Sequence, residues 1–429
     1  MRNSAHATVR RLWWRIVPLL AVVMLLSYLD KVNIGFAALQ MNRELRLSNT
    51  TFGLAAGLFA ISYAVAAIPS TLLLQRVGAR RWISLVMVVW GLCSAATALV
   101  TSARELMIAR IALGAAEAGF TPGVIYYLNS WFPSEYRGRV LGSFLLTLPL
   151  AVVIGGPLSA LLLGWDGAFG LSGWKWLFLM EGLPTALIAI LVFRFLPDSK
   201  RDAPWLPAAD KEWLTEQLEA EASGIDGSDA PVSAWRVIVS SRVSMLAVAY
   251  LGIVTSGTGA LIFLPLLIRS MGFSVQKSSV LAALPALIAA LALPAWGMWT
   301  DRSRCREIVV LATCVCIAVG LVGASALLPS SLAMLPLTVA FVGFFGSVAP
   351  FWTLPSSFLT GARAAAAIAA INVAGNLGNF CGPALLGWLV DRNHSYAAGL
   401  IGVSAVTVVP GAILALESWR QRANPHLAC

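Results

Sequence analysis

Four ionisable residues lie inside long apolar runs of this chain. Asp30 and Lys31 occupy one run, and Arg110 and Glu117 occupy another. The latter two are two helical turns apart, so their side chains leave one face of a helix, about 10 Å apart along its axis. An ionisable group at membrane depth costs roughly 2.5–3.5 kcal/mol and by default marks an ion or substrate path. These residues therefore favour a transport site, with a structural ion pair between two helices as the alternative.

The distance of each residue from its helix end gives its expected depth. If the first helix ends outside near Leu39, Asp30 lies about 13 Å below that surface. If the fourth begins outside near Arg104, Arg110 lies about 9 Å deep and Glu117 about 20 Å deep. We therefore expect Asp30, the lysine beside it and Arg110 to meet in the outer half of one cavity, with Glu117 nearer the midplane.

The elements that position these residues are membrane-spanning helices. Of the 429 residues, 59% are hydrophobic and only 12% are charged, whereas a soluble protein carries about 25% charged residues. Twelve apolar segments follow one another, each near the 20 residues that a helix needs to cross a bilayer. The first continues past Lys31 to about Ala38, so it is a membrane helix rather than a cleaved signal. The composition predicts an all-α integral membrane protein with twelve transmembrane helices.

Two six-helix halves account for the order of these segments. We expect a first half over residues 1–196, a linker over 197–236 and a second half over 237–429. The linker predicts a short amphipathic helix in KEWLTEQLEAEA, with its charges solvated. Several residue pairs recur 226 positions apart at matching places in the two halves, among them Arg76 with Arg302. This offset indicates duplication of a six-helix unit, and two such units around a central site are a transporter architecture.

The basic residues sit in short loops between apolar runs, and the net charge is +10. With both termini in the cytoplasm, the cytoplasmic segments hold 19 Lys and Arg residues and the opposite loops hold 7. That asymmetry follows the positive-inside rule. A nucleic-acid partner would instead require basic residues clustered on one soluble face. We therefore expect a multi-pass protein with both termini cytoplasmic, in contact with lipid and without nucleic acid.

Motifs for covalent or metal chemistry are missing from the sequence. The six cysteines form no CxxC pair and have no neighbouring histidine, so we interpret them as small buried apolar residues. There is no HExxH or GxSxG arrangement. We predict no metal, no cofactor and no enzymatic activity.

Two loops resemble a family signature. Residues 69–82, PSTLLLQRVGARRW, are similar to the signature loop of the major facilitator superfamily, and residues 297–306, GMWTDRSRCR, are similar to its second-half copy. The first copy departs from the family pattern at Thr71, where Gly is usual, and at Gln75, where Asp is usual; the second keeps Asp301. Such loops pin helices through charge contacts to helix ends. The resemblance implies a gating role for five residues: Arg76, Arg80, Arg81, Asp301 and Arg302.

Four strings are similar to the anion:cation symporter family within that superfamily. They are SYLDKVNIGFAAL, AEAGFTPGVIYYLNSWFP, FLMEGLPT and INVAGNLGNFCGP, at residues 27–39, 116–133, 178–185 and 371–383. The resemblance implies the major facilitator fold and bacterial uptake of organic carboxylates, as in tartrate-, phthalate- and hydroxyphenylacetate-type permeases. It also implies a monomer in a bacterial inner (plasma) membrane.

The resemblance assigns roles to single residues. Asp30 matches the family's first-helix acid, which is implicated in proton coupling, and Glu117 matches its fourth-helix acid. Lys31 and Arg110 match the cations that hold the substrate carboxylate. Lys31 stands where Arg is usual, and Lys acts as a point charge where Arg would bind bidentately. Five further residues sit where the family lines its cavity: Tyr28, Tyr63, Ser356, Asn372 and Asn376.

Together these features predict a secondary transporter that takes up an organic carboxylate by proton symport with alternating access. Lys31 and Arg110 would attract the anion. Asp30 and Glu117 would carry protons, because burial raises the pKa of a carboxyl and a neighbouring cation lowers it. Sodium, which could use the same oxygens, is the alternative coupling ion. Two other interpretations stay open: an exchanger of organic or phosphorylated anions, and a membrane sensor that does not transport.

Overall fold

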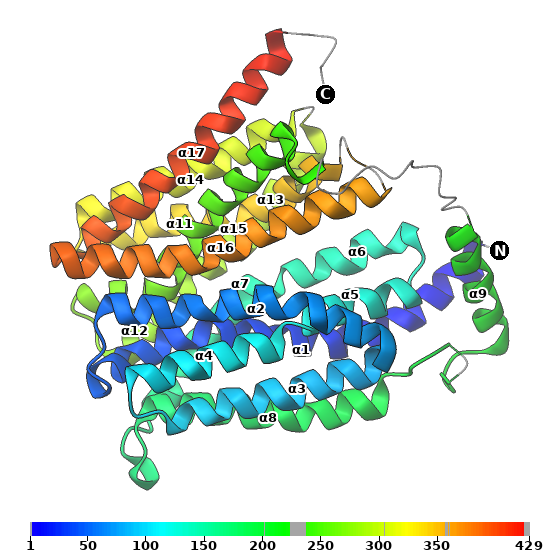
Figure 1. Cartoon of the computed structure of the whole chain (residues 1–429), viewed down its shortest axis with the longest axis horizontal. Helices are drawn as coiled ribbons and strands as arrows, with labels where there is room; N and C mark the ends of the chain where they lie inside the picture. Colours follow the sequence, from blue (N-terminus) through cyan, green and yellow to red (C-terminus); the bar gives the residue numbers. More distant parts are fainter. Residues whose placement is uncertain are drawn as a thin grey trace.

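Long helices lying side by side make up most of the molecule (Figure 1). The computed structural model describes residues 2–200, 202–223, 237–303, 305–356, 359 and 361–423, without the side chains of residues 2–5, 145, 356, 361, 362, 365 and 415–423. The described residues contain helices and turns and no strand. This confirms the predicted all-α class.

The helices fall into two sets separated by a linker helix. The first helix set comprises α1 (Arg2–Glu44), α2 (Asn49–Val77), α3 (Ala79–Ala96), α4 (Ala103–Glu117), α5 (Phe120–Trp131), α6 (Ser134–Leu145), α7 (Thr147–Leu163) and α8 (Gly173–Phe195). The linker helix is α9 (Ala208–Ser223). The second helix set comprises α11 (Ser241–Ser270), α12 (Val275–Leu281), α13 (Ala283–Arg302), α14 (Arg306–Leu327), α15 (Met334–Ser356), α16 (Gly361–Asn393) and α17 (Tyr396–Ala423). Short 3₁₀ turns are η1 (Thr97–Leu99), η2 (Ala168–Gly170) and η3 (Ser331–Ala333).

Eleven helical segments of the described chain are long and apolar enough to cross a membrane. Three of them join two helices each, namely α4 with α5, α6 with α7, and α12 with α13. Helix α16, with 33 residues, exceeds the roughly 20 residues that a span requires. With α16 the count agrees with the twelve transmembrane helices predicted.

The repeat offset reappears in the helix bounds. Helix α1 ends at Glu44 and α11 ends 226 positions later at Ser270. Helix α2 begins at Asn49 and α12 begins 226 positions later at Val275. Helices α8 and α17 begin 223 positions apart, so the offset holds to within a few residues along the chain and permits a comparison of corresponding positions.

The two sets meet at the end of the molecule where α2 begins and α16 ends, which we call the closed end. Helix α2 packs there against α16, and a side chain on Gly53 would clash with the backbone of Pro383. Asp391 of α16 accepts hydrogen bonds from the backbone nitrogens of Asn49 (3.1 Å) and Thr50 (2.7 Å). It also accepts hydrogen bonds from the side chains of Asn49 (2.8 Å) and Thr50 (2.6 Å). One carboxylate of the second set thus caps the first turn of α2, where a helix presents free N–H groups and a positive dipole end.

At the opposite end, which we call the linker end, the helix sets have separate cores. One large apolar cluster crosses both sets towards the closed end and includes Phe52, Phe263 and Leu386. Towards the linker end, the buried residues of one cluster all come from the first helix set and the linker, from Val9 to Leu214. A small third cluster comes from the second set alone. Within the described residues, the apolar core therefore joins the two sets at the closed end and leaves them unjoined at the linker end.

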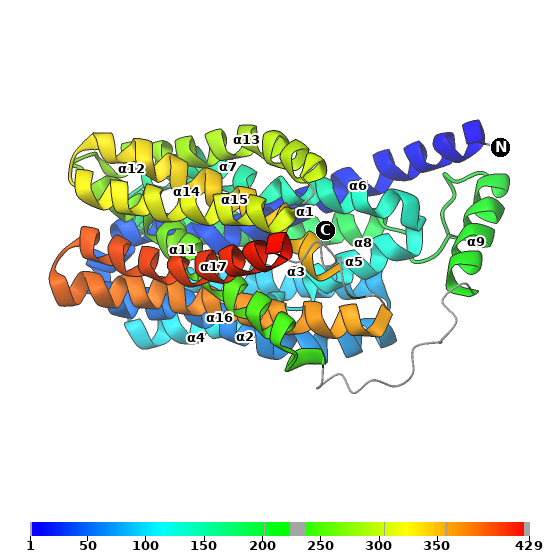
Figure 2. The same ribbon diagram turned by 90° about the horizontal axis from the view of Figure 1, so that it is seen from above.

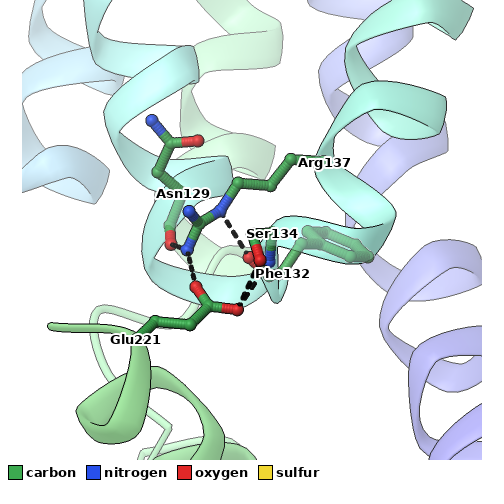
Figure 3. Close-up of polar contacts among 5 residues, drawn as sticks. All are labelled: Asn129, Phe132, Ser134, Arg137 and Glu221. Carbon is green, nitrogen blue, oxygen red and sulfur yellow. Dashed lines mark hydrogen bonds and ion pairs between the residues drawn. The ribbon is translucent and has the colours of Figure 1, made fainter. Parts of the chain in front are cut away.

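The linker forms a helix where one was predicted, namely α9, which lies across the linker end of the first helix set (Figure 2). Its acids do not all face solvent as expected. Asp210 pairs with Arg11 of α1 at 2.5 Å. Glu221 faces the turn between α5 and α6, where it accepts hydrogen bonds from Ser134 and pairs with Arg137 at 2.9 Å (Figure 3). Partial burial would raise the pKa of Glu221, but the hydrogen bonds from Ser134 and the charge of Arg137 bring that pKa below its ordinary value.

Candidate functional site

Lys31 and Glu117 form an ion pair between α1 and α4, with the lysine Nζ 2.8 Å from Glu117 Oε1. Glu117 is completely buried, whereas the Lys31 side chain keeps 24% of its surface exposed. Ser27, one turn before Lys31 on α1, donates its hydroxyl to the same carboxylate oxygen and accepts a hydrogen bond from the lysine at 3.1 Å. The second carboxylate oxygen, Oε2, has no partner among the described residues. A carboxylate held in this way stays close to its cation while one oxygen remains available.

The local sequence explains why Glu117 lies so deep. Helix α4 ends at Glu117, and α5 begins at Phe120 after the break at Ala118 and Gly119. The indole of Trp82 on α3 packs so closely against Gly119 that a side chain there would collide with it. Further along α4, a side chain on Gly114 would clash with α2. Small residues thus bring α4 close to its neighbours and place its ionisable groups inside the helix set.

Arg110 is a buried cation that forms no ion pair with an acid of the described residues. Its side chain is 1% exposed, and its guanidinium carbon lies 4.9 Å from the centre of the Phe59 ring on α2. Its Nε and Nη1 atoms have no hydrogen-bond partner among the described residues. Burying a guanidinium with unsatisfied donors is costly unless a partner arrives. The arrangement therefore suits an anion that supplies the missing acceptors.

Asp30 makes its hydrogen bonds on a different side of α1 from Lys31. It is 3% exposed and accepts hydrogen bonds from Ser94 of α3 and from Asn33, the latter at 3.1 Å. No ion pair to Asp30 is present in the part of the chain that the structure describes. Adjacent helical residues point about 100° apart. Lys31 therefore turns towards α4 while Asp30 turns towards α3 and α8. Asp30 and Arg110 still interact through their charges, so the expected meeting of Asp30, Lys31 and Arg110 in one cavity stays a prediction.

A second buried acid lies beside Asp30. Glu181 of α8 is 6% exposed and accepts a hydrogen bond from the side-chain amide of Asn33 at 3.0 Å. The sequence assigned no site role to Glu181, Asn33 or Ser94. A usable signal was the spacing of polar residues on the first helix, since Asp30 and Asn33 are three residues apart on one face.

Aromatic rings surround the exposed side of Lys31. Its Nζ lies 5.0 Å from the ring centre of Tyr28 and 5.3 Å from that of Tyr63. The second helix set contributes a further aromatic group that the sequence did not suggest, in which Tyr250 stacks on Phe351 with ring centres 4.7 Å apart. Rings beside a cation stabilise it and provide flat apolar surface.

Among the described residues, Asn372 and Asn376 of the second helix set hydrogen-bond to no charged group of the site. Asn376 donates to the backbone oxygen of Asn372 at 3.0 Å, within its own helix, and Asn372 is exposed. Ser356 is the last residue of α15, and its side chain lies outside the described residues.

The predicted gating residues lie at the linker end of the helices. Arg80 pairs with Asp198, which follows α8, at 3.1 Å, and so ties α3 to the start of the linker. The four others, exposed at the ends of α2 and α13 or in the first turn of α3, are Arg76, Arg81, Asp301 and Arg302. Among the described residues no group of three or more His, Cys, Asp and Glu side chains is arranged to hold a metal ion.

Three of the four predicted ionisable residues fall at the boundary between the two large apolar clusters, and Glu117 follows within the cluster of the first helix set, between Leu113 and Phe120. Asp30 and Lys31 fall between Met24 of one cluster and Val32 of the other. On α4, Arg110 falls between Leu106 and Leu113 in the same way. The charges thus lie deep in the molecule, and the residues directly on the linker side of this boundary belong to the core of the first helix set alone.

Comparison with known proteins agrees with this architecture. Residues 20–383 match the model of the Major Facilitator Superfamily. The chain is 38% identical to a proposed tartrate transporter of Agrobacterium vitis over 96% of its length and 92% of the relative. It is 37% identical to a quinolone resistance transporter of Acinetobacter baumannii, over 93% of its length and 92% of the relative.

A similar solved structure has 18% sequence identity to this chain. It is a bacterial homologue of the human lysosomal transporter Spinster in an inward-facing and occupied conformation, with a TM-score of 0.74 over 96% of this chain and 98% of that one. The twelve helices in two sets, the buried charges of the first set and the family match lead to one conclusion: the chain belongs to the major facilitator superfamily, whose members are membrane transporters rather than enzymes.

Proposed function

We propose that this protein takes up an organic carboxylate together with protons. The observation that carries the proposal is Arg110, a buried guanidinium with two unpartnered nitrogen atoms. It lies on the same helix as Glu117, which pairs with Lys31. A carboxylate presents two oxygens in the plane that a guanidinium recognises. An organic anion therefore fits this site better than a neutral solute does.

Lys31 has a double role in this scheme. Its ammonium neutralises Glu117 when the cavity is empty and turns towards the substrate when the anion arrives. Glu117 then becomes a buried carboxylate without its cation, which favours its protonation. Anion binding and proton binding thereby support each other, as symport requires. Sodium in place of the proton is an outcome of the test below.

The two cores support a rocking mechanism. The helix sets share one apolar core at the closed end and have separate cores at the linker end. We assign residues 1–196 and 237–429 to the two moving halves and residues 197–236 to the linker between them. With both termini in the cytoplasm of a bacterial inner membrane, as the charge of the loops favours, the closed end faces outward. The chain then has the arrangement of an inward-open carrier, working as a monomer.

The Arg80 pair with Asp198 and the loop residues Arg76, Arg81, Asp301 and Arg302 lie at the linker end in this orientation. We assign them to the gate that closes when the carrier turns outward. The rings of Tyr28 and Tyr63 beside Lys31, with Asn372, Asn376 and Ser356 from the second helix set, complete the proposed cavity lining.

Uptake by purified protein in liposomes tests the proposal. Labelled tartrate, phthalate, hydroxyphenylacetate and nicotinate are offered with an inward proton gradient, with an inward sodium gradient, or with no gradient. Accumulation that follows the proton gradient and collapses with an uncoupler is the expected result. Uptake only against preloaded anion identifies an exchanger, and binding without any flux identifies a sensor. Each of these last results would overturn proton symport.

The quinolone resistance transporter among the relatives favours a second candidate function, which is export of an amphiphilic compound. Cells that express the protein would then tolerate more quinolone than cells that express Arg110→Gln. Equal tolerance in both strains, with carboxylate uptake in liposomes, would leave the uptake proposal standing alone.

A further inference from the structure

The amide of Asn33 joins two buried carboxyl groups from different helices. Its nitrogen donates to Asp30 Oδ1 at 3.1 Å and to Glu181 Oε2 at 3.0 Å. The three residues are 3%, 1% and 6% exposed, in the order Asp30, Asn33 and Glu181. Asp30 Oδ2 and Glu181 Oε1 have no hydrogen-bond partner among the described residues. Two carboxyl groups thus face one neutral bridge in a region without water-exposed surface.

The surroundings of this pair hold little positive charge. Helix α7, which packs on α8, carries no ionisable residue. On α3 the ionisable residue near the pair is Cys93, which precedes Ser94. Beyond Asp30 lie Arg110 and Glu117 of α4. Within the described chain no ion pair reaches Asp30 or Glu181. Two ionised carboxylates a few ångströms apart without a bridging cation repel each other strongly, so a pair of this kind retains one proton.

The second helix set shows what a purely structural contact at this place looks like. The counterparts of Asp30 and Glu181, 226 positions later, are Ser256 and Thr407. Thr407 donates to the Ser256 hydroxyl at 2.6 Å, and Ser256 also bonds to the backbone oxygen of Val403 at 2.6 Å. Neutral hydroxyls therefore hold α11 to α17, as the carboxyl pair holds α1 to α8. Packing of these helices does not require acids.

We propose that Asp30, Asn33 and Glu181 form one proton-binding unit, in which Glu181 is a positioning residue that sets the pH at which Asp30 releases its proton. This inference rests on the proposed proton symport and extends it to a residue behind the substrate cavity. Glu181 faces α1 and α3 rather than the cations, so it acts through Asp30. The proton leaves from Asp30, and Asn33 holds the two carboxyl groups close together through its two hydrogen bonds.

Substitution of Glu181 and substitution of Asn33 should shift the pH of half-maximal uptake in opposite directions. Glu181→Gln removes the second carboxyl, so ionised Asp30 loses a repelling neighbour and releases its proton at lower pH. The pH of half-maximal uptake then moves towards acid by about one unit. Asn33→Leu removes the donor that stabilises ionised Asp30, so the same midpoint moves towards alkali. Thr185→Val is the matched control: Thr185 is buried one turn further along α8 and bonds only to the backbone oxygen of Glu181, at 2.7 Å.

The experiment measures proton-driven uptake between pH 5 and 9 for wild type and the three variants in liposomes, with anion exchange at fixed pH as the test of folding. Opposite shifts for Glu181→Gln and Asn33→Leu, with exchange retained and Thr185→Val unchanged, are expected. An unchanged profile for Glu181→Gln that still exchanges would overturn the inference. If Glu181→Gln loses exchange, the Asn33→Leu variant becomes the test. A pH profile of Asn33→Leu that does not shift towards alkali would reject the proton-binding unit.

Failure of the proposed symport is distinguishable from failure of this inference. If wild-type uptake ignores the proton gradient, the symport proposal fails by itself. The carboxyl pair is then examined by infrared difference spectroscopy during a pH titration of the purified protein. Loss of a protonated-carboxyl band in Glu181→Gln would support the shared proton, and an identical spectrum in both proteins would reject it.

Discussion

The two helix sets share a fold and an offset but differ in what they bury. In the first set the buried acidic and basic side chains among the described residues are Asp30, Arg110, Glu117 and Glu181. Their counterparts 226 positions later are Ser256, Pro336, Gly343 and Thr407, none of which ionises. In the described part of the second set the buried charge is Glu307, in the first turn of α14.

This difference shows that the helix packing itself does not need the charges. The second set packs its helices with small residues, hydroxyls and rings, as at Gly343 against Thr313 and Tyr250 against Phe351. Buried charges cost free energy that a purely structural contact can avoid. The first set retains buried charges, which indicates that this set binds ions and protons. The second set then contributes the shape of the cavity and its aromatic surface.

The largest effect should come from removing a cation of the first set. Lys31→Gln leaves Glu117 buried without its cation and removes one charge from the anion site. We expect uptake to fall roughly a hundredfold, as loss of a charge-assisted contact of about 2–3 kcal/mol implies. Initial rates in liposomes measure this. The double variant Lys31→Gln with Glu117→Gln restores a neutral pair and should recover folding without recovering uptake; recovered uptake would contradict the role of Lys31.

Glu117→Gln should separate coupling from binding. The amide keeps the size and one acceptor of the carboxyl but cannot ionise, so no proton can be released from it. We expect accumulation above equilibrium to disappear, at least tenfold, while exchange of labelled for unlabelled anion continues. Flux measured with and without an uncoupler checks this. Accumulation at the wild-type level would remove Glu117 from the scheme and weaken the contrast between the two sets.

At the closed end, Asp391 of the second set places its charge against the first turn of α2 in the first set. Asp391→Asn weakens the cap on α2, which combines a helix dipole with charged hydrogen bonds worth about 1–2 kcal/mol. The closed end should open about five- to thirtyfold more often. Labelling of a cysteine placed at Ala56, which is buried on α2 in the apolar cluster shared by the two sets, by an impermeant maleimide reports this opening. Asp166→Asn is the control, because Asp166 bonds to Gly173 within the first set; equal labelling in both would contradict a latch.

The smallest effect is expected for the hydroxyl pair of the second set. Ser256→Ala with Thr407→Val removes the two side-chain hydrogen bonds between α11 and α17 and should lower stability by about 1–2 kcal/mol. The pH dependence of uptake should not move, because neither group titrates. Thermal unfolding in detergent and the uptake profile check the two statements. A shifted pH profile would mean that the second set also handles protons, and the comparison between the sets would fail.

The sequence by itself determined the fold class, the number of spans and the ionisable residues at membrane depth. Hydropathy fixes spans because a backbone in lipid must satisfy its own hydrogen bonds, which leaves a helix as the local solution. Arg110 and Glu117 were recognisable for the same reason, since charges in an apolar run stand out without any knowledge of their partners. The offset of 226 residues likewise needed only the order of the residues.

The tertiary structure alone decided which of these residues meet. Asp30 and Lys31 are neighbours in the chain, yet the helical turn sends Asp30 to Ser94 and Asn33 and Lys31 to Glu117. Likewise, the link from Asp30 through Asn33 to Glu181 spans almost 150 residues of sequence and depends on how α8 packs against α1. Helical periodicity says which face a side chain leaves, but the rotation of each helix and the identity of its neighbour come from packing of the whole molecule.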